Sequence, residues 1–149
     1  MPTLLIVHHT PSPSMQAMFE AVLAGANHPD IEGVDVVRRP ALGATAADVL
    51  AADGYLLGTP ANLGSMSGAL KHFFDTVYYP CLDSTKGRPF GAYVHGNNDT
   101  SGTVRQLGAI TTGLGWTQVA EPVLVTGEPD KDALTALTEL GGTLAATLM

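Results

Sequence analysis

The chain has 149 residues, of which 45% are hydrophobic and only 14% are charged. Seven basic and fourteen acidic residues give a formal net charge of -7, which argues against nucleic acid or an anionic membrane as a partner. The length suits one domain, residues 1–149. With one cysteine, no basic leader and no run near the ~18 apolar residues of a membrane span, we expect a soluble, cytoplasmic protein.

Strand-like and helix-like patterns alternate along the chain. The segments that read as strands, several of them apolar runs typical of strands buried on both faces, are residues 3–9, 34–39, 54–60, 90–96 and 116–126, the last interrupted by Pro122. Apolar side chains recur at helical spacing within residues 15–26, 45–52, 70–77, 104–114 and 134–144. Thr45 and Asp48 resemble a capping box at the start of the second helix.

This order is a strand followed by a helix, repeated five times. It predicts an α/β fold of three layers, with a parallel sheet and helices on both faces. Five units in this length fit a sheet of order 2-1-3-4-5. Right-handed crossovers then bring the strand-to-helix loops together at the carboxyl edge, so we expect a ligand there, beside the switch point between strands one and three.

The first of these loops, "TPSPSMQ" (residues 10–16), carries three hydroxyl groups, from Thr10, Ser12 and Ser14. It leads into a helix N-terminus, where backbone N–H groups and the helix dipole favour an anion. Ser12 followed by Pro13 also fits an N-cap with proline at the first helical position. The residues alone leave both roles open, helix capping and anion binding.

The second loop carries a resemblance to a known family. "TPANLGSMSGALKHFFD" (residues 59–75) is similar to the pattern of the flavodoxin family, and more closely of its NAD(P)H-dependent quinone and FMN reductase branch. The shared features are Thr-Pro, a glycine, a small residue, a methionine, and a helix ending in Phe and Asp. The resemblance spans nearly the whole chain and implies a flavodoxin-like fold that binds FMN.

The resemblance also implies which residues hold the cofactor. The phosphate would be held without a basic side chain, by Thr10, Ser12, Ser14 and Met15. The ring would lie along the second loop, at Pro60, Ala61, Asn62, Leu63, Gly64 and Met66. The third loop would border its other side, at His95, Gly96, Asn97 and Asn98. His95 is the candidate for proton transfer, since histidine titrates near neutrality.

Alternatives remain at each loop. Pro11 and Pro13 depart from the glycine-containing T-x-T-G-x-T pattern and remove two N–H donors, which leaves open a family member that has lost FMN. The second loop also reads as an ordinary turn with Ser65 as N-cap. In the third loop, Asp99 or Thr100 is expected to cap the following helix.

The resemblance implies an enzyme in which FMN takes hydride from NADH or NADPH and passes electrons to a quinone, a flavin or another small acceptor. No Phe, Tyr or Trp occurs in "PANLGSM" (residues 60–66) or in "HGNNDTSG" (residues 95–102), so a ring face stays open for such molecules. A flavodoxin-type electron carrier is the alternative, and the acidic balance suits it. A homodimer is expected from related reductases. No metal is expected, since His8 and His9 point to opposite strand faces.

Overall fold

The computed structural model describes all residues, from Met1 to Met149. The strands are β1 (Thr3–His8), β2 (Asp35–Pro40), β3 (Gly54–Asn62), β4 (Ser65–Met66), β5 (Pro89–Gly96), β6 (Thr117–Gln118) and β7 (Val123–Thr126). The helices are α1 (Pro13–Ala26), α2 (Ala46–Ala51), α3 (Gly68–Cys81), α4 (Ser101–Leu114) and α5 (Lys131–Thr147), with a short 3-10 turn, η1, at Ala41–Gly43. None of the helices combines the length and apolar character needed to cross a membrane.

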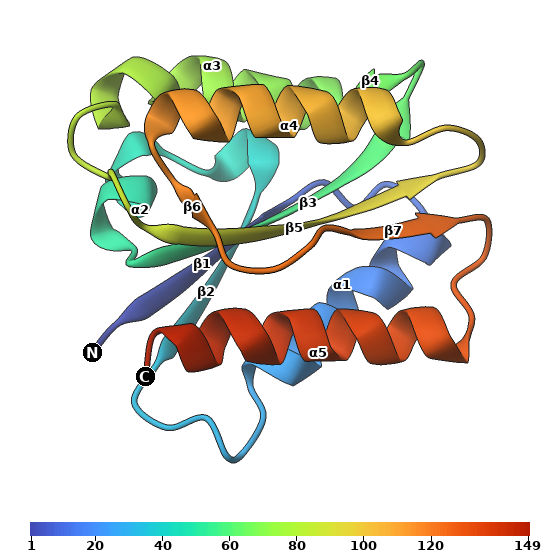
Figure 1. Cartoon of the computed structure of the whole chain (residues 1–149), viewed down its shortest axis with the longest axis horizontal. Coiled ribbons are helices and arrows are strands. Elements are labelled where there is room, and N and C mark those ends of the chain that lie inside the picture. Colours follow the sequence, from blue (N-terminus) through green and yellow to red (C-terminus); the bar gives the residue numbers. More distant parts are fainter.

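The central sheet is parallel, and its strands run in the order β2-β1-β3-β5, with β6 and β7 both on the far side of β5. This confirms the predicted order 2-1-3-4-5, because β6 and β7 together occupy the place of the fifth strand. The helices α3 and α4 cover one face, and α1 and α5 cover the other (Figure 1). The three-layer flavodoxin-like prediction is therefore confirmed.

Alternation along the strands divides the core into two clusters, one on each face of the sheet. In β1, Leu5 and Val7 pack in the α3/α4 layer, while Leu4 and Ile6 pack in the α1/α5 layer. All four are at most 1% exposed. Burial on both faces explains why β1 is an uninterrupted apolar run in the sequence.

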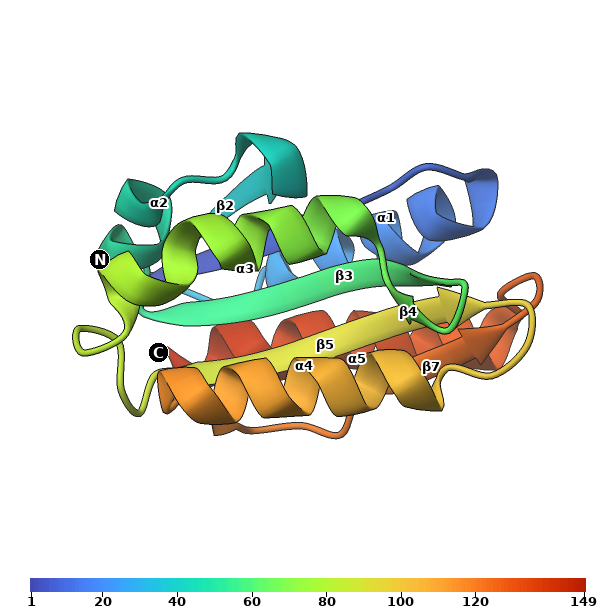
Figure 2. The ribbon, with the colours of Figure 1, turned by 90° about the horizontal axis from the view of Figure 1, so that it is seen from above.

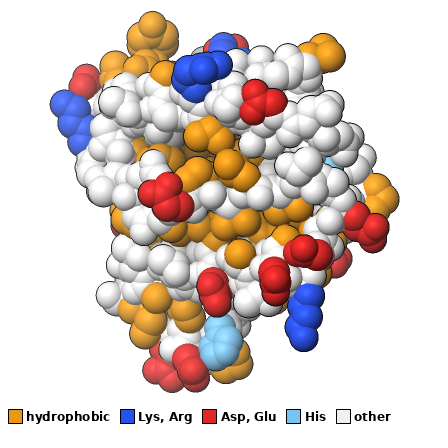
Figure 3. All heavy atoms as spheres, turned by 45° about the vertical axis from the view of Figure 1, so that its right-hand side comes forward, with side chains coloured by type: hydrophobic (Ala, Val, Ile, Leu, Met, Phe, Trp, Pro, Cys, Tyr) orange, Lys and Arg blue, Asp and Glu red, His pale blue; other side chains and the backbone are white.

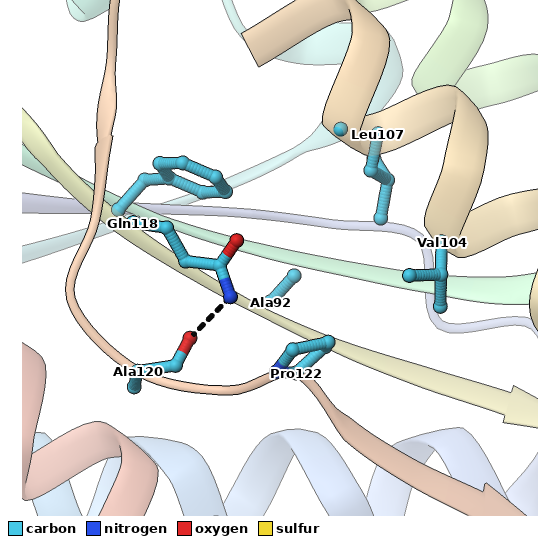
Figure 4. A pocket seen from close by; sticks show the side chains of 8 residues that line it. Ala92, Val104, Leu107, Gln118, Ala120 and Pro122 are labelled. Atoms are coloured by element: carbon cyan, nitrogen blue, oxygen red, sulfur yellow. Dashed lines mark hydrogen bonds between the residues drawn. The ribbon is translucent and has the colours of Figure 1, made fainter. Parts of the chain in front are cut away.

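The fifth strand is broken, as Pro122 indicated. Because proline has no N–H to donate, it cannot join a strand ladder from within, and residues 120–122 leave the sheet between β6 and β7, after the Val119 N–H has bonded the Phe90 carbonyl. A cavity of about 40 Å³ lies between this segment, β5 and α4, and its lining includes Ala92, Leu107 and Pro122. There the Gln118 side chain donates to the Ala120 carbonyl at 3.1 Å (Figure 4).

The strand β7 lies at one edge of the sheet, with β2 at the opposite edge, and Leu124 on β7 is 48% exposed. Figure 3 shows one face of the molecule, with a band of hydrophobic side chains across its middle and acidic side chains below the band.

The cavity beside β6 lies near the amino half of β5, because β6 pairs with Pro89 and Phe90. It is therefore separate from the carboxyl edge.

Two element boundaries differ from the predictions. The third strand continues beyond Pro60 to Asn62 and turns back as β4, so the second loop is a β-hairpin. The helix predicted from the apolar pattern of residues 70–77 continues to Cys81, with Pro80 inside the last turn of α3. A proline there interrupts only the end of a helix that tertiary contacts already hold.

Candidate cofactor site

The connections that follow β1, β3, β5 and β7 all lie at the carboxyl edge of the sheet, because these strands are parallel. Figure 2 shows the loops after β1, β3 and β5 at the same end of the molecule. The register of the strands sets how far each one extends toward this edge: His8 of β1 lies beside Gly58 of β3, and Pro60 of β3 lies beside His95 of β5. The three loops predicted to hold a cofactor therefore share one edge.

The first loop ends in the predicted helix cap. Ser12 is the N-cap of α1, and its Oγ accepts from the Met15 N–H at 3.2 Å, with Pro13 opening the helix. The capping role is confirmed. It does not exclude anion binding, because a hydroxyl that accepts one hydrogen bond still has its own proton to donate.

The loop also offers donors that the chain itself does not use. The backbone N–H groups of Thr10, Ser12 and Ser14 donate to no backbone or side-chain atom, and neither does the Ser14 hydroxyl. No acidic residue stands in the first turn of α1, so the positive end of its dipole meets no carboxylate there. These donors fit a phosphate group, even though Pro11 and Pro13 supply none.

Two of the predicted phosphate residues are engaged elsewhere. The side chain of Met15 is fully buried in the α1/α5 core, and its N–H is the one that Ser12 caps. The Thr10 hydroxyl lies 2.7 Å from Nδ1 of His8. The His8 ring stacks on Phe19 of α1, with centroids 4.0 Å apart. Burial, and then the charge of Arg38, lower the pKa of His8 below its ordinary value.

The second loop is a hairpin with a two-residue turn. Leu63 and Gly64 at its tip both have positive φ, 52° and 78°, as a type I′ turn requires. Leu63 is fully exposed, and Asn62 and Gly64 are exposed beside it. The N–H groups of Leu63 and Gly64 donate to no other atom of the chain, so the tip can bond the polar edge of a flat ring.

The other predicted ring residues lie at the base of the hairpin. Pro60 and Met66 are buried, and Ala61 is half-buried. Met66 belongs to the core cluster under α3 and α4, so it supports the hairpin from below. The cap of α3 is Ser67, whose Oγ accepts from the Leu70 N–H at 3.2 Å. The alternative with Ser65 as N-cap is therefore wrong, since Ser65 belongs to β4.

The third loop begins at His95 and Gly96. Nε2 of His95 lies 2.8 Å from the Gly127 carbonyl oxygen, and since a carbonyl only accepts, Nε2 carries a proton. In the neutral ring Nδ1 is then the nitrogen that can accept one. Asn97 and Asn98 are exposed, while Gly96 is buried. A Cβ on Gly96 would lie 3.0 Å from Thr100 Cγ2 and 3.5 Å from Ala61 Cβ, so the two loops are in close contact.

The capping prediction for α4 is confirmed in part. Thr100 occupies the N-cap position, but its side chain makes no capping bond. Asp99 accepts from the Ser101 N–H at 2.9 Å and from its hydroxyl at 2.7 Å. These bonds from the Ser101 side chain and backbone hold the pKa of Asp99 below its ordinary value.

Tyr78 and Tyr79 lie far from this edge. They are in the last turns of α3, which begins at the carboxyl edge and runs about 20 Å away from it at 1.5 Å per residue. The Tyr78 hydroxyl packs against Gly113 near the C-terminal end of α4. Neither tyrosine can shield a ring at the carboxyl edge.

One functional residue was missed from the sequence. The Gln106 side chain, on α4, accepts from the Met66 N–H at 2.8 Å and donates to the Ser65 Oγ at 3.0 Å. It ties the hairpin to a helix forty residues further along the chain. A single half-buried glutamine on an amphipathic helix carries no signal that could have identified this role.

An open parallel sheet with its loops gathered in this way defines a flavodoxin-like protein. Residues 8–130 match the family model described as NADPH-dependent FMN reductase. The chain therefore belongs to the NADPH-dependent FMN reductase family of flavodoxin-like flavoproteins, which confirms the resemblance found in the second loop.

Individual known proteins are also similar to this chain. A flavodoxin of Aquifex aeolicus is 38% identical over 74 residues, which are 50% of this chain and 39% of that protein's length. The WrbA-like flavodoxin of Agrobacterium tumefaciens has a TM-score of 0.80 at 20% identity, covering 99% of this chain and 98% of the other. A flavodoxin from the domain Archaea has a TM-score of 0.82 at 19% identity, covering 98% of both chains. These two structures show the fold.

Proposed function

We propose that the chain is an FMN-dependent oxidoreductase that takes electrons from NADH or NADPH and delivers them to a small acceptor such as a quinone or a free flavin. The observation that carries this proposal is the convergence of three loops at the carboxyl edge, within a chain that belongs to the NADPH-dependent FMN reductase family. When bound, FMN supplies the electron-transfer chemistry, so no acid–base dyad is required.

In this proposal the first loop binds the phosphate of FMN. The N–H groups of Thr10, Ser12 and Ser14, with the Ser12 and Ser14 hydroxyls, surround the N-terminus of α1. A dianionic group there gains from the helix dipole and from several donors at once. We infer that Met15 contributes to phosphate binding only through the position of its backbone in the first turn of α1, since its side chain is buried.

The hairpin and the third loop orient the ring. The N–H groups of Leu63 and Gly64, at the tip of the hairpin, have no partner in the chain, and the amide side chains of Asn62, Asn97 and Asn98 can both donate and accept. The protonated Nε2 of His95 is held by the Gly127 carbonyl, which leaves Nδ1 to receive a proton at the site. We propose His95 as the proton-transfer residue on this basis.

An open ring face separates this proposal from the carrier alternative. The hairpin and the third loop contain no Phe, Tyr or Trp, so no such side chain from these two loops would cover the ring. A nicotinamide or a quinone could then stack on it. The net charge of -7 and the flavodoxin relatives support the second candidate, a carrier that exchanges electrons with protein partners.

Two measurements on the purified protein test the proposal. Titration with FMN is expected to show saturable quenching of flavin fluorescence, and anaerobic NADPH or NADH is then expected to bleach the flavin absorbance within seconds. Binding without bleaching, even at millimolar NADPH and NADH, would assign the chain to the carriers. A protein that neither contains nor binds FMN would refute both functions and favour a member that has lost its cofactor.

A further inference from the structure

The hairpin that would hold the ring is too small to be stable alone. It has only two residue pairs, Ala61 with Met66 and Asn62 with Ser65. Isolated two-stranded hairpins are marginal in water even when longer. Leucine at positive φ in the turn adds strain, because a Cβ crowds the backbone there. Contacts from outside the hairpin must therefore determine where its tip lies.

The base of the hairpin is fixed by a buried threonine. Thr59 is 0% exposed, and its Oγ1 accepts from the Ser67 N–H at 3.0 Å while donating to the Pro60 carbonyl at 2.8 Å. This holds the two ends of the hairpin together where β3 leaves the sheet and α3 begins. It does not reach the tip.

The outer strand of the hairpin is fixed by Gln106. Its Oε1 accepts the Met66 N–H, which points away from β3, and its Nε2 donates to the Ser65 Oγ. The side-chain amide thus takes the place of a third strand along β4. Because Gln106 is half-buried, water competes poorly with these two bonds.

The tip is placed by a direct backbone contact with α4. A Cβ on Gly102 would lie 2.2 Å from the Gly64 carbonyl oxygen, so only glycine lets the helix come this close. Gly102 and Gln106 are four residues apart and therefore lie on the same side of the helix. One turn of α4 therefore contacts both the tip of the hairpin, through Gly102, and its outer strand, through Gln106.

The same helix begins where the third loop ends, since α4 starts at Ser101. It therefore holds the hairpin on its side and carries the third loop at its N-terminus. We propose that Gly102 and Gln106 are positioning residues that set the spacing between the two loops flanking the flavin ring. This inference rests on the proposed function, since it assigns these loops to FMN.

The test measures FMN affinity and hairpin stability separately. In Gln106→Ala we expect the FMN dissociation constant to rise about tenfold, equivalent to ~1.4 kcal/mol, with a matching rise for Gly102→Ala. In the FMN-free protein, the Met66 amide should exchange with deuterium at least ~10-fold faster in Gln106→Ala, because its hydrogen bond is lost. Gln106→Glu should keep the amide protected, since a carboxylate can accept from both Met66 and the Ser65 hydroxyl.

Two matched variants on α4 serve as controls. A Cβ on Gly108 would meet no atom within 4 Å, and Thr112 is exposed, so Gly108→Ala and Thr112→Ala should leave FMN affinity unchanged. Faster exchange at Met66 with unaltered FMN affinity would overturn the positioning role while leaving the proposed function intact. A wild-type protein that binds no FMN would instead refute the proposed function, and the positioning role with it.

Discussion

The substitution Gly141→Ala tests how closely α1 and α5 must pack to form one face of the fold. A Cβ at residue 141 would lie 2.0 Å from the Val22 carbonyl oxygen and 3.0 Å from the Ala26 nitrogen. Ordinary contact begins at 3.4 Å, so the helices would have to separate by 1.4 Å, the difference between 3.4 and 2.0 Å. The obstructing atoms are backbone, so no side-chain rotation can relieve the clash.

The magnitude follows from two opposing effects. Overpacking of a well-packed core lowers the free energy of unfolding by up to about 3 kcal/mol. Replacing glycine by alanine within a helix raises it by about 1 kcal/mol. We expect a net loss of about 2 kcal/mol, which lowers the Tm of a chain of this size by roughly 4–8 °C. Gly108→Ala has the same helical gain without the clash, so it should stabilise the protein by about 0.5–1 kcal/mol.

Urea unfolding followed by Trp116 fluorescence measures both variants. Trp116 is the single tryptophan, is 6% exposed and stacks on Tyr55 at 4.0 Å between centroids, so unfolding changes its surroundings completely. The dependence of the free energy on urea should be the same in all three proteins, because the fold is unchanged. Equal stability of Gly141→Ala and Gly108→Ala would refute the reasoning from close helix contact.

Four further predictions concern the site and its frame. Ser12→Ala should lose about 1 kcal/mol of stability with the cap and bind FMN more weakly, whereas Ser14→Ala should weaken only FMN binding; fluorescence titration and urea unfolding distinguish them. Arg88→Met should cost about 2 kcal/mol in urea unfolding with FMN affinity unchanged, because Arg88 bonds three carbonyls at the end of α2, before β5 begins. Leu63→Asn should raise stability by up to ~1 kcal/mol, since asparagine tolerates positive φ, yet weaken FMN binding by removing an exposed apolar side chain. Burial lowers the pKa of His8, so the unfolded chain binds more protons and the free energy of unfolding falls as pH drops below about 6.5; His8→Gln should flatten that dependence, measured by urea unfolding at several pH values.

The parts of the fold that depend on neighbouring residues were predictable from the sequence. The cap at Ser12 and the capping box of Thr45 with Asp48 both form as expected, the latter through reciprocal bonds of 3.2 and 2.9 Å. The five β/α units and the break at Pro122 were also predicted, since each is determined within a few residues. Sheet order then followed from the general rules of parallel sheets.

The hairpin was not predictable, because its stability comes from distant residues. Pro60 and Gly64 both indicate a turn when read locally, and a two-residue strand carries no periodic signal. The structure extends the strand because Pro60 still pairs with His95 and because Gln106 bonds the outer edge of β4. Arg88 is a similar case, since three of its carbonyl partners lie 36 to 39 residues earlier in the chain.

These distant contacts bear directly on the choice between reductase and carrier. Because the hairpin and the third loop lack Phe, Tyr and Trp, they would leave a face of FMN uncovered, but an uncovered face is useful only if the ring edge is held firmly. Gln106 and the Gly102–Gly64 contact hold one loop, while the Gly127 N–H bonds the Gly96 carbonyl at 3.0 Å and holds the other. With its walls anchored to the scaffold, such a site would admit a second flat molecule above FMN without rearrangement. A hydride-accepting flavoenzyme needs room of this kind, so these contacts support the proposed reductase over the carrier.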